Sequence, residues 1–207
     1  MIRLDAYFSF VLLVSLSLIA QGQTSQSPKD TPATTDTSFT VEDSAIATAA
    51  LLEIFGEAPP EKLVLIDQTS VGVPPGMAAM TRLGGKAQPL LAQVPKEAKE
   101  QFETRNKSHL TVDPGQLKVS FQMVMATPAA ANKIVEGGAG WESFRSKFPN
   151  APGITLLSLP GVSSDRTKAM IYIGTSCGTT CGTGYLILLG KDGDHWKVLD
   201  KVMIWIS

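Results

Sequence analysis

Apolar residues recur at helical spacing between positions 41 and 55 and predict a helix there. They are Val41, Ala45, Ala49, Leu52 and Phe55. Thr40 can cap the start of this helix, and Asp43 lies three residues on, where a carboxylate favours a helix N-terminus. Gly56 is a natural terminator. The folded part of the chain is therefore expected to begin near Thr40.

Three more helices are predicted before the last third of the chain. Residues 96–106 carry only two apolar side chains, Ala98 and Phe102, so this helix should lie at the surface with a solvated charged face. Shorter helices are predicted over residues 128–135 and 141–148, each ended by Gly or Pro. Between the first two helices, residues 71–94 give only a weak helical pattern, and no structure is predicted for them.

The other apolar runs predict β-strands. Residues 62–67 form a short run rich in β formers, and residues 116–127 alternate apolar with polar positions, which is typical of a half-buried strand. The last third predicts an antiparallel β-meander from runs at residues 154–159, 169–173, 185–189 and 196–206. Asp192-Gly193 is a strong hairpin signal between the last two runs. Helices first and strands last predict an α+β fold, with N-terminal helices packed on one face of a C-terminal antiparallel β-meander.

The N-terminus has the pattern of a secretory signal peptide. Arg3 precedes an uncharged apolar run over residues 8–20, which is shorter than the roughly 20 residues that span a bilayer. We place the cleavage before Gln23, with cleavage after Ala20 as an alternative, and a buried core helix or an uncleaved anchor as the alternatives to a signal peptide. Residues 23–38 are rich in Ser, Thr and Pro and predict a disordered tether. Residues 39–207 then form a single domain, which we expect to be secreted or periplasmic.

Composition and charge restrict the function classes. Of the 207 residues 43% are hydrophobic and 18% are charged, which is ordinary for a globular domain with its own core. Lys and Arg number 18 against 19 Asp and Glu, so the chain lacks the cationic excess that nucleic-acid binding requires, and no nucleic-acid partner is expected. With two Cys and two His, no metal site or cofactor is expected.

The C-terminal third carries an ordered set of Trp, Gly and Cys residues. Its members are Trp141-x-x-Phe144, Phe148-Pro149, Gly153, Tyr172, the run Cys177-Gly-x-x-Cys181-Gly-x-Gly184, Trp196 and Trp205-Ile-Ser207. This arrangement resembles small secreted bacterial proteins with no established activity, over roughly residues 141–207. The resemblance implies a fold and a compartment, and it implies no catalytic residue.

Cys177 and Cys181 are separated by three residues at a predicted hairpin tip. In an exported protein such neighbours should oxidise, so a structural disulfide is the leading interpretation. Redox catalysis is an alternative, although it typically uses Cys-x-x-Cys at a helix N-terminus. A metal site would need two further ligands, for which only His109 and His195 exist.

Two more candidate sites remain open on the sequence. Gly174-Thr-Ser176-Cys-Gly178 matches the G-x-S-x-G elbow of hydrolases, but the segment leads into another strand and not into a helix. Aromatic residues could line a binding surface if they share one exposed face, although such residues more often pack between helix and sheet. The candidates are Trp141, Tyr172, Tyr185 and Trp205.

Two functional hypotheses follow. The first is a non-enzymatic exported domain that binds an envelope or extracellular partner through its sheet face or its disulfide-held hairpin. The second is a small extracytoplasmic enzyme, hydrolytic or thiol-based, with a site around Ser176, Cys177, Cys181 and His195. The first is favoured because no acid/base pair or cofactor motif is recognisable.

Overall fold

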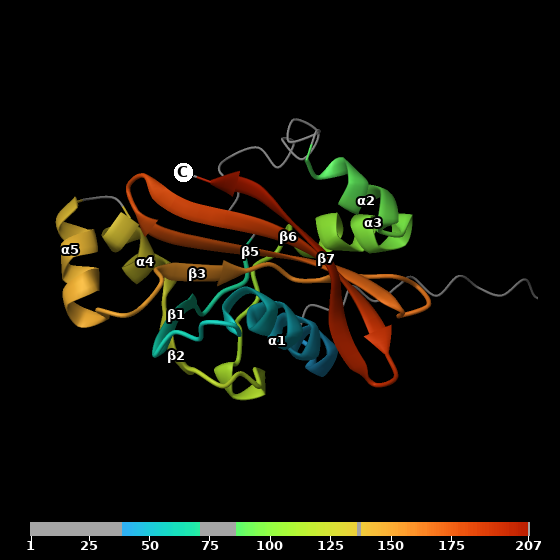
Figure 1. Cartoon of the computed structure of the whole chain (residues 1–207), viewed down its shortest axis with the longest axis horizontal. Helices are drawn as coiled ribbons and strands as arrows, with labels where there is room; N and C mark the ends of the chain where they lie inside the picture. The colour runs from blue at the N-terminus through green and yellow to red at the C-terminus, as the bar shows by residue number, and fades with distance from the viewer. Residues whose placement is uncertain (1–38, 71–85, 136–137, 207) are drawn as a thin grey trace, which may run out of the picture. The chain divides into compact units, whose positions relative to one another are not determined.

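The computed structural model describes residues 39–70, 86–135 and 138–206, which belong to the second of the two units into which the chain divides, Thr35–Ser207. The predicted signal peptide, the predicted tether and residues 71–85 lie outside the described residues. The α+β prediction is confirmed (Figure 1).

The described residues form five α-helices and seven strands. The helices are α1 (Val41–Phe55), α2 (Gln88–Gln93), α3 (Lys96–Arg105), α4 (Pro128–Val135) and α5 (Gly138–Lys147). The strands are β1 (Lys62–Ile66), β2 (Gln122–Ala126), β3 (Ile154–Leu157), β4 (Gly161–Val162), β5 (Lys168–Gly178), β6 (Cys181–Asp192) and β7 (His195–Ile206). Helix α2 lies in the segment for which the sequence predicted no structure.

The strands form one mixed sheet in the order β2-β1-β3-β5-β6-β7, with β4 also pairing with β5. The predicted antiparallel meander is confirmed for β5, β6 and β7. Strand β1, however, runs parallel to both β2 and β3. The cause lies in the connections: α2 and α3 separate β1 from β2, α4 and α5 separate β2 from β3, and helical crossovers of this kind return the chain in the same direction.

Helices cover both faces of the sheet, where the sequence predicted one. Helix α1 packs on one face, where Ile46 and Leu51 contact Ile171 of β5. The other face carries α2 and α3 over β5 and β6, and α4 and α5 over β1 and β3 (Figure 1). Ile171 and its neighbour Tyr172 are therefore both fully buried, on opposite faces. The unbroken apolar runs of β5 and β6 are the sequence signature of strands buried on both sides.

Helix α1 is fixed at its N-terminus by the predicted cap. Thr40 and Asp43 form a capping box, in which each side chain accepts a hydrogen bond from the other's backbone N–H. Asp43 is 2% exposed and also receives two hydrogen bonds of 2.7 Å from the guanidinium of Arg105 in α3. Arg105 donates further to the Pro160 carbonyl, so the ion pair joins α1, α3 and the segment before β4.

The strand predicted over residues 116–127 begins only at Gln122. Its ladder partner β1 starts at Lys62, opposite Gln122, so residues 116–121 have no neighbouring strand within the described part of the chain. They form a 3₁₀ turn (Pro114–Gln116) and an extended segment that runs beside α1. The apolar alternation still holds, since Leu117 and Phe121 pack in the core under α1.

The hairpin that joins β6 and β7 turns through two residues, because Asp192 pairs with His195. Gly193 is the first of them and has φ of +60°, a backbone conformation that glycine adopts without strain. The tip of this hairpin projects beside the N-terminal half of α1.

Candidate functional site

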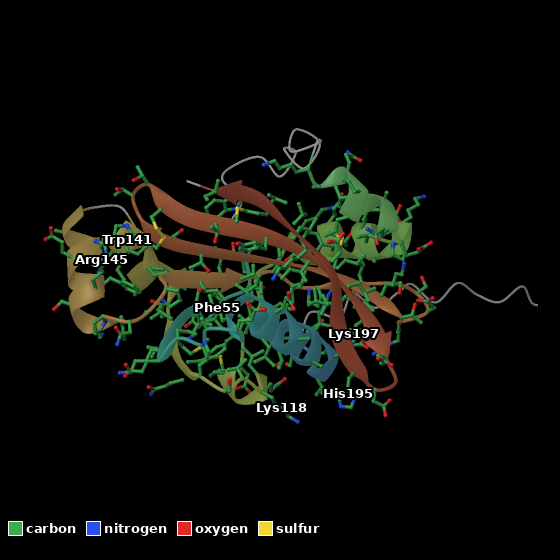
Figure 2. All side chains as sticks on the ribbon, viewed as in Figure 1. Phe55, Lys118, Trp141, Arg145, His195 and Lys197 are labelled. Carbon is green, nitrogen blue, oxygen red and sulfur yellow. A yellow bond between two sulfur atoms is a disulfide. The ribbon has the colours of Figure 1, made fainter. Side chains whose placement is uncertain are left out.

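A groove of about 690 Å³ runs along the outward face of α1. Helix α1 forms its floor, residues 115–118 form one wall, and the tip of the β6–β7 hairpin forms the other. It is lined by Val41, Ser44, Ala45, Thr48, Ala49, Leu52, Gly115, Gln116, Lys118, Asp194, His195 and Trp196. Figure 2 shows Lys118 and His195, one from each wall, on the side of the sheet that carries α1.

The floor of the groove is apolar and open to solvent. Val41 is 81% exposed and Leu52 is 37% exposed, and they are two of the four large hydrophobic side chains that are exposed among the described residues. Ala45, Thr48 and Ala49 lie between them, and their small side chains keep the floor low. The groove therefore presents apolar surface that nothing in the described part of the chain covers.

The polar groups of the floor already have partners. The Ser44 hydroxyl lies 3.0 Å from both the Thr40 carbonyl and Gln116 Oε1. Thr48 Oγ1 accepts the backbone N–H of Lys118 at 3.1 Å, which also holds the wall against the helix. Gln116 Nε2 donates to Asp113. The floor thus offers few free hydrogen-bonding groups to a ligand.

Charged residues lie along the rim. Lys118 stands on one wall and Asp194 on the other, both exposed and neither in an ion pair within the described residues. At the start of α1, Glu42 pairs with Arg166 and Lys191 instead. The rim therefore carries one unpaired charge of each sign, on opposite sides of the groove.

The helical pattern in the sequence includes residues of this groove floor, but it assigned them no functional role. Val41, Ala45 and Leu52 of the stripe that predicted α1 face outward, whereas Phe55 packs against the core, and the buried face is formed by Ile46, Ala47, Ala50 and Leu51. Both faces of α1 are therefore apolar. The walls come from segments more than 60 residues away in the chain, and no local signal in the sequence connects them to α1.

Cys177 and Cys181 form a disulfide at the tip of the β5–β6 hairpin, with a Cα–Cα separation of 5.0 Å. Arg145 of α5 donates to the Cys177 carbonyl at 3.1 Å and so ties the hairpin tip to α5. The pair closes a hairpin whose strands are already held by a long antiparallel ladder. This geometry is that of a staple between two strands.

The four aromatic residues predicted as a binding surface do not share an exposed face. Trp141 is 2% exposed and packs between α5 and the sheet, and Tyr172 is fully buried under α3. Tyr185 is half-buried on the face that carries α1. Tyr172 and Trp205 are in contact, through a 2.8 Å hydrogen bond from the indole Nε1 to the phenolic oxygen. Burial raises the pKa of Tyr172 to about 12, although this hydrogen bond acts in the opposite direction.

Of the residues of the enzymatic alternative, Ser176, Cys177 and Cys181 lie at one hairpin, whereas His195 lies far from them. Ser176 pairs with Gly182 near one end of β6, whereas His195 pairs with Asp192 at the other end. Ten residue steps of β6 separate these positions, which corresponds to about 30 Å. Ser176 also lies within a strand and not at a strand-to-helix turn, so the hydrolase elbow is not formed.

In the described ranges, no group of three His, Cys, Asp or Glu side chains could hold a metal ion. His109 Nδ1 instead lies 2.8 Å from the Thr69 carbonyl. None of the helices in the described part of the chain is long and apolar enough to cross a membrane. Comparison with known protein families, curated proteins and solved structures finds no match for this chain.

Proposed function

We propose that this protein is a non-enzymatic binding domain of the extracytoplasmic space, and that the groove along α1 receives a segment of a partner protein. The observation that carries the proposal is the exposed apolar floor, in particular Val41 and Leu52 at its two ends. Exposed apolar surface rimmed by polar residues is typical of a protein interaction site, because covering it removes unfavourable contact with water.

A polypeptide partner fits the shape of the groove better than a small molecule. Small-molecule sites enclose most of their ligand, whereas this groove has a solvent-exposed floor and a charged rim. An apolar core within a polar rim is the usual organisation of a protein interface.

The extracytoplasmic compartment is supported by the apolar N-terminal run and by the disulfide. It is tested by the intact mass of protein exported by a bacterial host, measured without reductant and before and after iodoacetamide. We expect a mass that begins at Gln23 and does not change on alkylation. A retained N-terminus, or two added carbamidomethyl groups, would contradict this part of the proposal.

The groove is tested by selecting peptides from an unbiased phage-displayed library on the folded domain. Selected peptides are then measured by fluorescence anisotropy against three variants. Ala45→Arg fills the floor, Val41→Glu places a charge at its end, and Ala129→Arg changes an exposed alanine on α4, across the sheet.

We expect the first two variants to weaken binding by about tenfold or more, which corresponds to about 1.4 kcal/mol, and Ala129→Arg to bind as the unmodified protein does. Circular dichroism confirms that each variant is folded. If the library gives no binder, or if binders tolerate both groove variants, the proposed function is wrong.

A further inference from the structure

We propose that the segment bound in this groove is an amphipathic α-helix of about three turns from another protein, with acidic residues along the edge that faces Lys118. This inference rests on the proposed function and specifies the partner of the same groove.

Helix α1 is apolar on both of its faces. Its inner face packs against the sheet through Ile46 and Leu51. Its outer face carries Val41, Ala45 and Leu52. An apolar stripe of a helix is normally buried against another element in a globular protein. The outer face of α1 therefore has the composition of a helix that packs against a further element.

The outward residues of α1 have the spacing of a helix-packing seam. Val41, Ala45, Thr48 and Leu52 are separated by four, three and four positions, as apolar residues are when two helices pack side by side. The seam is about 17 Å long, at 1.5 Å per residue, and matches about three turns of a partner helix. The small central side chains allow a partner to approach closely.

The hydrogen bonding of the groove favours a helix over an extended peptide. Ser44 and Thr48 have partners already, and the backbone of α1 is committed to its own helix. An extended segment lying on this floor would leave its own N–H and C=O groups without partners, which costs free energy once they are removed from water. A helix satisfies these groups internally and presents only side chains.

The shape of the groove also argues against α1 of a second copy as the occupant. The seam of α1 lies between two walls, formed by residues 115–118 and by the β6–β7 hairpin. Two such recessed surfaces are both concave and cannot bring their floors together. The occupant must be a convex element that stands clear of its own domain, such as a terminal or projecting helix.

The rim charges define the polar edges of the partner helix. Lys118 and Asp194 stand on opposite walls and have no ion-pair partner within the described ranges. An acidic residue of the partner beside Lys118, and a basic residue beside Asp194, would complement both. Such rim contacts fix the direction in which the helix lies more than they add affinity.

The test uses synthetic peptides of about four turns with leucine at the heptad a and d positions, Glu along one edge and Lys along the other. One form is hydrocarbon-stapled on its polar face, one is unstapled, and one has a central proline. Dodecanoate serves as a probe for acyl chains. The peptides selected from the library are tested in the same way, with and without a central proline.

We expect the stapled peptide to bind more tightly than the unstapled one, the proline form to lose about tenfold or more, and circular dichroism to show helix formed on binding. Ala45→Arg should abolish binding, and Lys118→Glu should weaken it about threefold, whereas Lys133→Glu on α4 should not. These results together would support the inference.

The other outcomes overturn it in distinguishable ways. Library peptides that bind in the groove but tolerate proline would exclude the helix and leave the proposed function standing. Binding of dodecanoate alone, sensitive to Ala45→Arg, would replace a protein partner by an acyl chain. Self-association of the unmodified protein that Ala45→Arg abolishes would make a second copy the occupant. The absence of any binder would refute both proposals.

Discussion

Replacing Asp43 by alanine should destabilise the protein by about 3–5 kcal/mol, because it breaks a buried ion pair with the guanidinium of Arg105. The side chains of Arg105 and Asp43 are only 10% and 2% exposed, and the two hydrogen bonds between them measure 2.7 Å each. About 1 kcal/mol of the loss comes from the capping box, since Asp43 also accepts the N–H of Thr40.

The loss is large relative to the total stability of a domain, which is typically about 5–15 kcal/mol. The assay is urea denaturation followed by far-UV circular dichroism. Glu53→Ala is the control on the same helix, because Glu53 pairs with Lys201 and the two side chains are 38% and 43% exposed. Removing such a surface pair should cost less than about 1 kcal/mol.

A double-mutant cycle then isolates the pair. Asp43→Ala combined with Arg105→Met should cost much less than the sum of the two single changes, because the second change removes the buried guanidinium whose pairing with Asp43 the first change broke. A loss below about 1 kcal/mol for Asp43→Ala, or strict additivity with Arg105→Met, would refute this account of how α1 is attached to α3.

Three further predictions concern the β-meander. The pKa of Tyr172 is about 12 in the folded state and near 10 in the unfolded state. The stabilisation that Tyr172 gives the fold is therefore complete below pH 10. It is lost as the pH rises towards 12, by about 3 kcal/mol at most. Urea denaturation between pH 8 and pH 11 should show this slope, and Tyr172→Phe should reduce it. Replacing both cysteines by serine should cost about 2 kcal/mol, since the loop closed by the Cys177–Cys181 bond is only about five residues long, and should leave the circular dichroism spectrum unchanged. Gly184→Ala should cost about 3 kcal/mol in urea denaturation, because the added Cβ would lie 1.9 Å from Nε1 of Trp205, which is held by Tyr172.

Each of these has a contrary result. An unchanged alkaline slope in Tyr172→Phe would place the titrating group elsewhere. A collapse of the fold in the double serine variant would make the disulfide more than a staple. Gly193→Ala is the control for Gly184→Ala: nothing lies within 4 Å of its added Cβ, and its φ of +60° should cost only about 1 kcal/mol. Equal losses at both glycines would contradict the contact with Trp205.

The sequence predicted most elements of the fold because their signals are local. The Thr40–Asp43 cap, the hairpin at Asp192-Gly193 and the Cys177–Cys181 disulfide each depend on residues within a few positions of one another. The parallel pairing of β1 was not predicted, since it depends on which strands the crossovers bring together. The two-sided burial of β5 has a local signal in its unbroken apolar run, from which only a strand was predicted.

The candidate site also has one part with a local sequence signal and another part without one. The sequence by itself determined that α1 is a capped helix with an apolar stripe, because helical spacing and capping are properties of a short segment. Which stripe of α1 meets the sheet, and which remains outside, was decided only by the tertiary structure. Ile46 and Leu51 pack against the sheet. The walls around the outward face of α1 come from residues 115–118 and from the β6–β7 hairpin. Contacts between segments this far apart depend on how the whole chain packs, and no local pattern encodes them.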